Sequence, residues 1–200
     1  YGQQITLIDT AGIRRRGRID PGVEKFSVIR AFKAIERADV ALFVLDGTEG
    51  ISAQDAHIAG MILEYLKSVI VLINKWDAVE KDTHTMVDYT ETIRRELKFL
   101  DYVPILFTSA VSGKNVSDII PTALRIQEER FFRISTGELN RIIHRALDTH
   151  APPSKAGKRL KIFYVSQVNV DPPVIMFHVN DKNLVHFSYQ RFLENQIRAY

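Results

Sequence analysis

Residues 69–77 read Val-Ile-Val-Leu-Ile-Asn-Lys-Trp-Asp, five apolar residues followed by a polar loop. A short apolar run that ends in polar residues is typical of a β-strand buried on both faces. Such strands belong to parallel sheets covered by helices, and ligands of these sheets bind at the carboxyl ends of the strands. The sequence therefore predicts a parallel sheet here, with a binding site at residues 74–77.

The neighbouring segments repeat the order strand, helix. Further strands are predicted at 5–8, 40–45 and 105–107, and the strand at 40–45 is also expected to be buried on both faces. Apolar residues at helical spacing predict helices over 27–38, 58–66, 87–99 and 116–131. This alternation is typical of an α/β domain with right-handed crossovers.

Near residue 130 the pattern changes. The second part reads as a helix over 139–147 capped by Ser135 or Thr136, a loop over 151–157, strands at 160–168 and 174–179, and a helix over 188–199. Since this order does not continue the α/β pattern, we expect two domains, 1–130 and 131–200, the second of them small and α+β.

Composition excludes several classes of protein. Hydrophobic residues make up 46% and charged residues 26% of the 200 residues, as in a globular chain. The absence of cysteine excludes a disulfide scaffold, a thiolate zinc site and a cysteine nucleophile, and fits a reducing compartment. No apolar run is long enough to span a bilayer, so we expect no membrane association. Because the chain begins at Tyr1 without methionine, we expect it to be part of a longer protein.

Charge is distributed unevenly. The formal net charge is +3, but residues 1–129 carry a net −3 and residues 130–200 a net +6. The basic second part predicts contact with a polyanion; an ordinary solvated surface is the alternative. The basic residues expected to contact RNA or a partner here are Lys155, Lys158, Arg159 and Lys161.

Three polar motifs follow predicted strands. Asp9-Thr10-Ala11-Gly12 offers a carboxylate that can hold Mg²⁺ through water and a glycine that lets a backbone N–H approach a phosphate. Asn74-Lys75-Trp76-Asp77 offers a carboxylate that can accept both the ring N–H and the amine of guanine. Asn74 can connect neighbouring loops, and the Lys75 stem can lie along a base.

The third motif is Thr108-Ser109-Ala110-Val111, where the small Ala110 lets its N–H donate to the guanine carbonyl. For each motif taken alone, a capping or turn role is the alternative. The ordered set of three favours nucleotide binding.

The string Asp9–Gly17, together with Asn74–Asp77, closely resembles the second GTPase domain of the bacterial double-GTPase family Der or EngA, and residues 184–200 resemble its C-terminal KH-like domain. The resemblance implies a Ras-like P-loop GTPase domain followed by a KH-like domain. It implies that the cofactors are GTP or GDP with Mg²⁺. The nucleotide-binding residues would be Asp9, Thr10, Ala11, Gly12, Ile13, Asn74, Lys75, Trp76, Asp77, Ser109, Ala110 and Val111.

The resemblance also implies a cytoplasmic GTP-hydrolysing switch in assembly of the large (50S) ribosomal subunit. Its partners would be that subunit, its rRNA and the other GTPase domain of the parent protein. The alternative is a non-catalytic RNA or protein interaction fragment that keeps a GTPase scaffold.

Two features depart from the family pattern. The 200 residues contain no G-x-x-x-x-G-K-[ST] loop or switch I threonine before Asp9, and no strand after the last predicted helix. Most phosphate contacts come from that loop, so we expect these residues alone to hydrolyse no GTP.

Ile13 occupies the place of the water-orienting glutamine, so no catalytic residue is assigned. The parent protein would then position the attacking water by backbone groups, by a K⁺ ion, which the resemblance suggests, or by a partner. The alternative is that Ile13 only packs against the sheet.

The arginines at 14–18 and the residues of 130–200 each have more than one interpretation. Arg14, Arg15, Arg16 and Arg18 form a predicted nucleotide-sensitive loop that contacts RNA or the KH-like domain, with a solvated loop as the alternative. Residues 130–200 lack the G-x-x-G of RNA-binding KH domains, which favours weak phosphate contact or a docking role. The aromatic side chains of this part are interpreted as core, with a stacking platform as the alternative: Phe163, Tyr164, Phe177, His178, Phe187, Tyr189 and Phe192.

Overall fold

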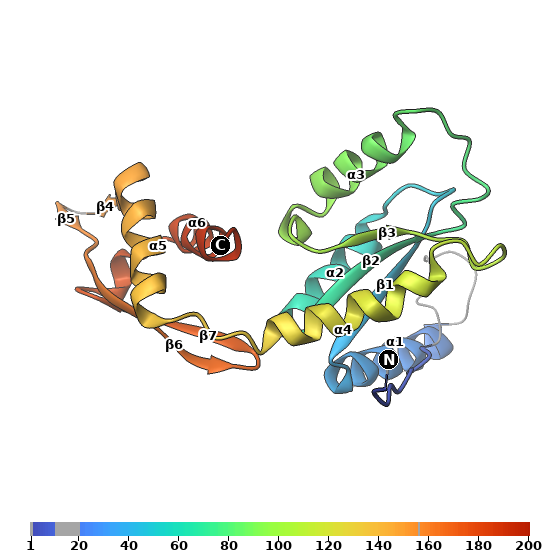
Figure 1. Ribbon diagram of the computed structural model, residues 1–200, viewed down its shortest axis with the longest axis horizontal. Coiled ribbons are helices and arrows are strands. Elements are labelled where there is room, and N and C mark those ends of the chain that lie inside the picture. The colour runs from blue at the N-terminus through green and yellow to red at the C-terminus, as the bar shows by residue number, and fades with distance from the viewer. Residues whose placement is uncertain (1, 11–20, 156) are drawn as a thin grey trace. The chain divides into compact units, whose positions relative to one another are not determined.

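The computed structural model describes residues 2–10, 21–155 and 157–200. It divides into two compact units, Tyr1–Gln127 and Glu128–Tyr200, and each is described by itself (Figure 1). The domain boundary predicted after residue 130 falls at the last residue of helix α4 (Ile119–Arg130).

The first unit is built on a parallel sheet, as the sequence predicts, and three of the four predicted strands form it. The strands are β1 (Val40–Asp46), β2 (Ser68–Asn74) and β3 (Ile105–Phe107), in the order β1-β2-β3. Asp46 pairs with Asn74 and Ile73 with Phe107, so the three strands end close to one level. Residues 69–73 of the central strand are all buried, which confirms burial on both faces.

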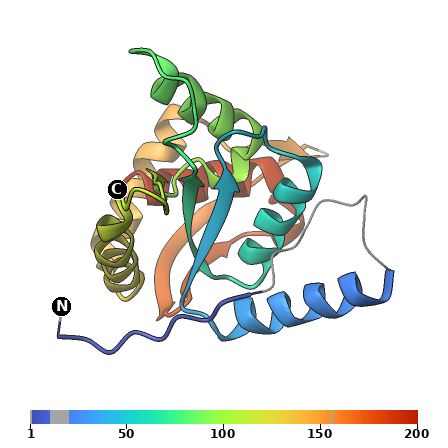
Figure 2. The same ribbon diagram turned by 90° about the vertical axis from the view of Figure 1, so that its right-hand side faces the viewer.

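Helices cover this sheet. They are α1 (Pro21–Arg37), α2 (Ala53–Glu64), α3 (Thr85–Glu96) and α4, with short 3₁₀ turns at Lys98–Leu100 and Val116–Asp118. Figure 2 shows α2 and α4 on opposite sides of the strands. Ser52 begins α2 with a capping box, because its hydroxyl accepts the Asp55 N–H and the Asp55 carboxylate accepts the Ser52 N–H.

Two predictions about this unit are wrong. Residues 5–8 form no strand: Ile5, Leu7 and Ile8 are exposed in a segment without regular structure. A strand needs a neighbour for its backbone hydrogen bonds, and no described strand pairs with this segment. Strand β1 is buried on one face only, because Val44 is 56% exposed beside the buried Phe43 and Leu45. It forms the edge of the sheet, and its other face is open in the described part of the chain.

The second unit is α+β. It contains α5 (Thr136–Thr149), the short hairpin β4 (Ser154–Lys155) and β5 (Lys158–Arg159), the long hairpin β6 (Ile162–Val170) and β7 (Pro173–Val179), a 3₁₀ turn at Lys182–Leu184, and α6 (Phe187–Arg198). The Ser135 hydroxyl accepts the Glu138 N–H, which confirms Ser135 as the cap of α5. The small hairpin occupies much of the segment predicted as a loop.

One apolar core holds the second unit together. Its buried residues are Leu139, Ile143, Ala146, Leu160, Val165, Leu184, Tyr189 and Leu193. Asn140 of α5 fastens the helix to β6, since its side chain accepts the Val165 N–H at 3.0 Å and donates to the Val165 carbonyl at 2.8 Å. These bonds give both backbone polar groups of Val165 a partner in α5.

The interpretation of the aromatic side chains as core holds for only part of the set. Tyr189 is buried, and Phe177 and Phe192 pack against the core. Phe163, Tyr164, His178 and Phe187 are exposed. Helical and strand periodicity identify a buried face but not the length of the segment that is covered, so these four were assigned to the core wrongly.

None of the described helices is long and apolar enough to cross a membrane.

Candidate nucleotide-binding site

Two loops lie side by side where β2 and β3 end. We call residues 74–77 the NKWD loop and residues 108–115 the Ser109 loop. The Thr108 N–H donates to the Ile73 carbonyl at 2.8 Å, and the Trp76 N–H donates to the Thr108 carbonyl at 3.0 Å. The pairing of the two strands therefore continues beyond their ends and brings two of the three predicted motifs together.

Asn74 connects the two loops, as predicted, but through an unexpected group. Its Oδ1 accepts the Ala110 N–H at 3.0 Å. The sequence predicts that this N–H donates to the carbonyl of guanine. In the structure it is engaged by Asn74, which ends β2 directly beside the Ser109 loop.

Asp77 is held as an acceptor by Ser109. The Ser109 hydroxyl, which is 0% exposed, hydrogen bonds to the Asp77 carboxylate and lowers its pKa from the ordinary value of 3.8, with a smaller lowering by Lys81. The Ser109 oxygen also accepts the Ser112 N–H at 3.1 Å, which fixes the hydroxyl in place. A carboxylate that is ionised and exposed can accept two N–H groups from a base. Sequence reasoning names Ser109 as a binding residue but misses this contact.

Ser109→Ala is expected to raise the pKa of Asp77 toward its ordinary value, because the hydroxyl is the largest cause of the lowering. A lowered carboxyl pKa contributes stability that is present above the unfolded pKa and is lost as pH falls through the folded pKa. Because the folded pKa of Asp77 is higher in the variant, Asp77 should become protonated, and this contribution should be lost, at a higher pH than in the wild type. A ¹³C NMR titration of the Asp77 carboxyl measures this directly. Ser109→Thr keeps the hydroxyl and should keep the low pKa; equal titration of wild type and Ser109→Ala would exclude this role.

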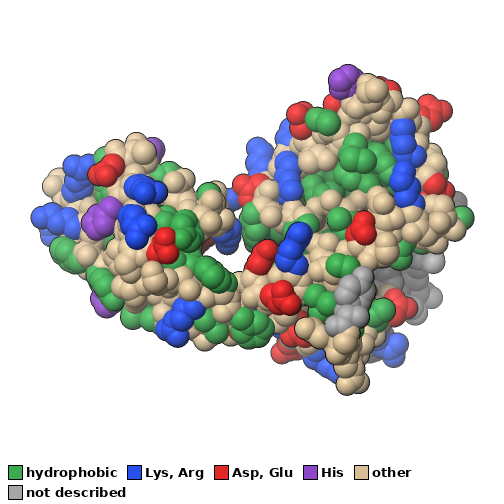
Figure 3. Space-filling model, in the orientation of Figure 1, with side chains coloured by type: hydrophobic (Ala, Val, Ile, Leu, Met, Phe, Trp, Pro, Cys, Tyr) green, Lys and Arg blue, Asp and Glu red, His purple; other side chains and the backbone are tan. Residues whose placement is uncertain are grey.

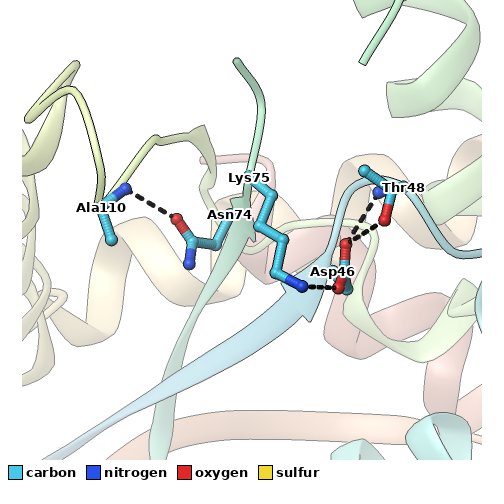
Figure 4. A network of polar contacts seen from close by, with 5 residues as sticks. All are labelled: Asp46, Thr48, Asn74, Lys75 and Ala110. Carbon is cyan, nitrogen blue, oxygen red and sulfur yellow. Dashed lines mark hydrogen bonds and ion pairs between the residues drawn. The ribbon is translucent and has the colours of Figure 1, made fainter. Parts of the chain in front are cut away.

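Lys75 reaches away from the Ser109 loop, toward β1. Its Nζ lies 2.6 Å from Asp46 Oδ2 (Figure 4). The Asp46 Oδ1 accepts the Thr48 N–H at 2.9 Å and the Thr48 hydroxyl at 2.6 Å. Lys75 and Thr48 together lower the pKa of Asp46 to about 2. Asp46 is not among the predicted site residues, although its place at the carboxyl end of the neighbouring strand is a signal that the sequence contains.

The buried side chain of Trp76 anchors the NKWD loop in the core. The sequence places it among the nucleotide-binding residues, but its side chain is 2% exposed and packs in the core. Its ring lies 4.4 Å from that of Phe107 and 5.0 Å, edge on, from that of Tyr89. The Tyr89 hydroxyl in turn donates to the Gly47 carbonyl at 2.9 Å.

Gly47 lets the ends of β1 and β2 approach closely. Its N–H donates to the Asn74 carbonyl at 2.8 Å. A Cβ at this position would lie 2.9 Å from the same carbonyl oxygen, too close for any other residue without a backbone shift. The position of the NKWD loop relative to β1 therefore depends on this glycine.

Sequence comparison identifies the group of proteins to which this site belongs. The chain is 48% identical to GTPase Der of Chloroflexus aggregans over 99% of this chain and 44% of that protein, and 50% identical to GTPase Der of Pelotomaculum thermopropionicum over 99% and 45%. The elongation factor Tu GTP-binding domain family matches residues 2–152, and the C-terminal KH-domain-like family of EngA bacterial GTPases matches residues 133–200. The chain belongs to the Der/EngA family.

The solved structures agree on the fold of this Der/EngA chain. A crystal structure of an Era variant from Aquifex aeolicus bound to GDP·AlF₄⁻ superposes with a TM-score of 0.50, at 23% identity, over 96% of this chain and 68% of that one. This likeness shows the fold alone. The chain spans about 44% of the length of its Der relatives.

The first predicted motif, residues 9–12, lies only partly within the described residues. Asp9 and Thr10 lie exposed in a segment without regular structure, and no contact joins them to the NKWD or Ser109 loops among the described residues. Ala11, Gly12, Ile13, Arg14, Arg15, Arg16 and Arg18 lie outside the described residues. Val111 is 91% exposed at the tip of the Ser109 loop.

Metal binding by the described residues would depend on Asp9. No group of three or more His, Cys, Asp or Glu that could hold a metal occurs in the part of the chain that the structure describes. Mg²⁺ in nucleotide sites commonly takes one or two carboxylates and completes its shell with phosphate oxygens and water. A single exposed carboxylate fits that arrangement.

The basic residues predicted to contact RNA surround the small hairpin of the KH-like unit. Lys158 and Arg159 form β5, and both are exposed, as is Lys161 just after it. Lys155 lies in β4 and pairs with Lys158. Figure 3 shows Lys and Arg side chains gathered at this end of the unit. The structure thus brings these residues into one region.

Proposed function

We propose that this chain supplies the guanine-recognition part of a GTP-binding and GTP-hydrolysing switch. The observation that carries the proposal is the pairing of the NKWD loop with the Ser109 loop beside the exposed Asp77: the Asn74 Oδ1 accepts the Ala110 N–H at 3.0 Å, and the Trp76 N–H donates to the Thr108 carbonyl at 3.0 Å. Guanine presents a ring N–H and an amine side by side, and an ionised carboxylate accepts both. Adenine lacks this pair of donors, so it would leave Asp77 without a partner.

The described residues have separate roles in this function. Asp77 binds the base edge, Ser109 lowers the pKa of Asp77, and Asn74 keeps the two loops together through the Ala110 N–H. Asp9 would hold Mg²⁺ together with the phosphates, and the metal would supply charge neutralisation there. No catalytic residue is assigned, and K⁺ dependence stays a prediction tied to Ile13.

We further propose that the whole protein acts in the cytoplasm in assembly of the large (50S) ribosomal subunit. Membership of the Der/EngA family supports this, as does the exposed basic hairpin of the KH-like unit, which suits contact with rRNA phosphates. Docking against another GTPase domain of the parent protein remains part of the same proposal.

Competition binding tests the nucleotide proposal. A fluorescent guanine nucleotide bound to the full-length protein should be displaced by GDP, weakly by IDP, which lacks the amine, and not by ADP. Equal displacement by ADP would contradict the proposal and favour an interaction module without nucleotide. These 200 residues by themselves, which contain no G-x-x-x-x-G-K-[ST] loop, should show no turnover above buffer. Magnesium-dependent hydrolysis by them would overturn that part.

A further inference from the structure

Lys75 is anchored at both ends. Its backbone adopts a left-handed conformation, with φ of 58°, and the next side chain, Trp76, is buried at 2% exposure. The far end, Nζ, lies 2.6 Å from Asp46 on the neighbouring strand. The four methylene groups between these points are therefore held across the ends of β2 and β1, as Figure 4 shows.

Asp46 is built to hold a cation at a defined place. One carboxylate oxygen accepts both Thr48 donors, which leaves the other for Lys75. The Asp46 side chain is 25% exposed and the Lys75 side chain 60% exposed. The ion pair raises the pKa of Lys75 with a further contribution from Glu49, so both charges persist over a wide pH range.

The strand ends that carry this pair are fixed relative to each other. Asp46 and Asn74 are register partners, and the Gly47 N–H donates to the Asn74 carbonyl at 2.8 Å. The direction of the Lys75 side chain is thus set by the sheet. An ion pair this open to solvent contributes little to folding stability, so stability alone does not explain so many contacts to one carboxylate.

Lys75 and Asp77 flank Trp76 in the NKWD loop. Both residues are exposed, whereas Trp76 between them points into the core. A base that hydrogen bonds to Asp77 through its edge must lie with one face near this outer surface. The aliphatic stem of a lysine covers apolar surface well while its charged end stays paired.

We propose that Asp46 is a positioning residue for guanine nucleotide binding, which holds Lys75 so that the Lys75 stem forms one wall of the base site beside Asp77. The proposal rests on the proposed function. Asp46 itself does not touch the base; it acts through Lys75. Without Asp46, the long lysine side chain samples many rotamers and has to be ordered each time a nucleotide binds.

A double-mutant cycle in the full-length protein tests this. Asp46→Asn should weaken GDP binding about two- to ten-fold, the effect of ordering one long side chain. It should weaken IDP binding by the same factor, because selection for the amine belongs to Asp77. In a Lys75→Met background, which keeps an apolar stem without the charge, Asp46→Asn should cause no further loss. Asp46→Glu keeps the negative charge and should recover much of the affinity.

Asp82→Asn is the matched control. Asp82 accepts the N–H groups of His84 and Thr85 and the Thr85 hydroxyl, much as Asp46 accepts those of Thr48, whereas Lys75 pairs with Asp46. This variant should bind GDP as the wild type does. Thermal unfolding of each variant shows that the affinities refer to folded protein.

Each outcome decides the proposal. Wild-type GDP affinity in Asp46→Asn overturns the proposal, because Asp46 would then have no effect on binding. An equal loss of affinity in the Lys75→Met background also overturns it, because Asp46 would then act without Lys75. A changed ratio of GDP to IDP affinity also overturns it. If the wild-type protein does not prefer GDP to ADP, the proposed function fails first and this inference fails with it.

Discussion

Asp77→Asn is expected to move the preference of the site from guanine to xanthine nucleotides. A carboxylate offers two acceptors, which match the ring N–H and the amine of guanine. A carboxamide offers one acceptor and one donor, so the guanine amine would face another donor. Xanthine carries a carbonyl in place of the amine and matches the carboxamide at both positions. Asp77 is exposed, so both side chains would be accessible to a base at this position.

The change should be large because it reverses a charged hydrogen-bond pair. Hydrogen bonds to charged groups commonly change affinity about ten- to a hundred-fold when one partner is lost. We expect GDP affinity to fall by that factor and XDP affinity to rise relative to the wild type. Competition of GDP, XDP, IDP and ADP against one fluorescent nucleotide in the full-length protein measures all four.

Loss of GDP binding alone would be ambiguous, since any damage to the loop produces it. A gain for XDP is a different result, because a distorted loop gains no affinity for a new base. Asp82→Asn makes the same chemical change at another loop carboxylate and should leave the preference for guanine intact. Unchanged selectivity in Asp77→Asn would mean that the NKWD loop does not read the base edge.

The sequence predicts strand β2 well because its five apolar residues must be covered on both faces. The same apolar composition misleads at 40–45 and at 5–8. Hydrophobicity shows which residues favour burial, but it cannot show whether a second layer or a neighbouring strand is present to cover them. Val44 is therefore 56% exposed although its segment resembles β2 in sequence.

Site residues that belong to a local motif could be predicted from the sequence. Residues whose role depends on contacts between distant segments could not. Asp77 is recognisable in the string at 74–77, whereas the roles of Asp46 and Ser109 arise from strand register. Register places Asp46 beside Asn74, and the continuation of the β2–β3 pairing places Ser109 near Asp77. The hydrogen bond from the Ala110 N–H to the Asn74 side chain has the same origin, because Asn74 ends β2 beside the Ser109 loop.

Trp76→Ala is expected to cost the chain about 3–5 kcal/mol in free energy of unfolding, the usual effect of removing a buried large aromatic side chain. Trp76 is 2% exposed and touches Phe107 and Tyr89 at ring distances of 4.4 Å and 5.0 Å. A cavity of this size between β3 and α3 cannot close, because both elements are held by the sheet and its core. Trp76 is the only tryptophan, so far-UV circular dichroism in urea is the suitable measurement.

The same change should weaken guanine nucleotide binding, since Trp76 is the support on which Lys75 and Asp77 are displayed. Trp76→Phe keeps a ring in the core and should retain most of the stability and affinity. Phe163→Ala removes an aromatic side chain that is 64% exposed and should change the unfolding free energy by less than about 0.5 kcal/mol. If Trp76→Ala unfolds at the wild-type urea concentration, the residue is not the structural base of the loop, and the position of Asp77 must be maintained by Ser109 and the strand register instead.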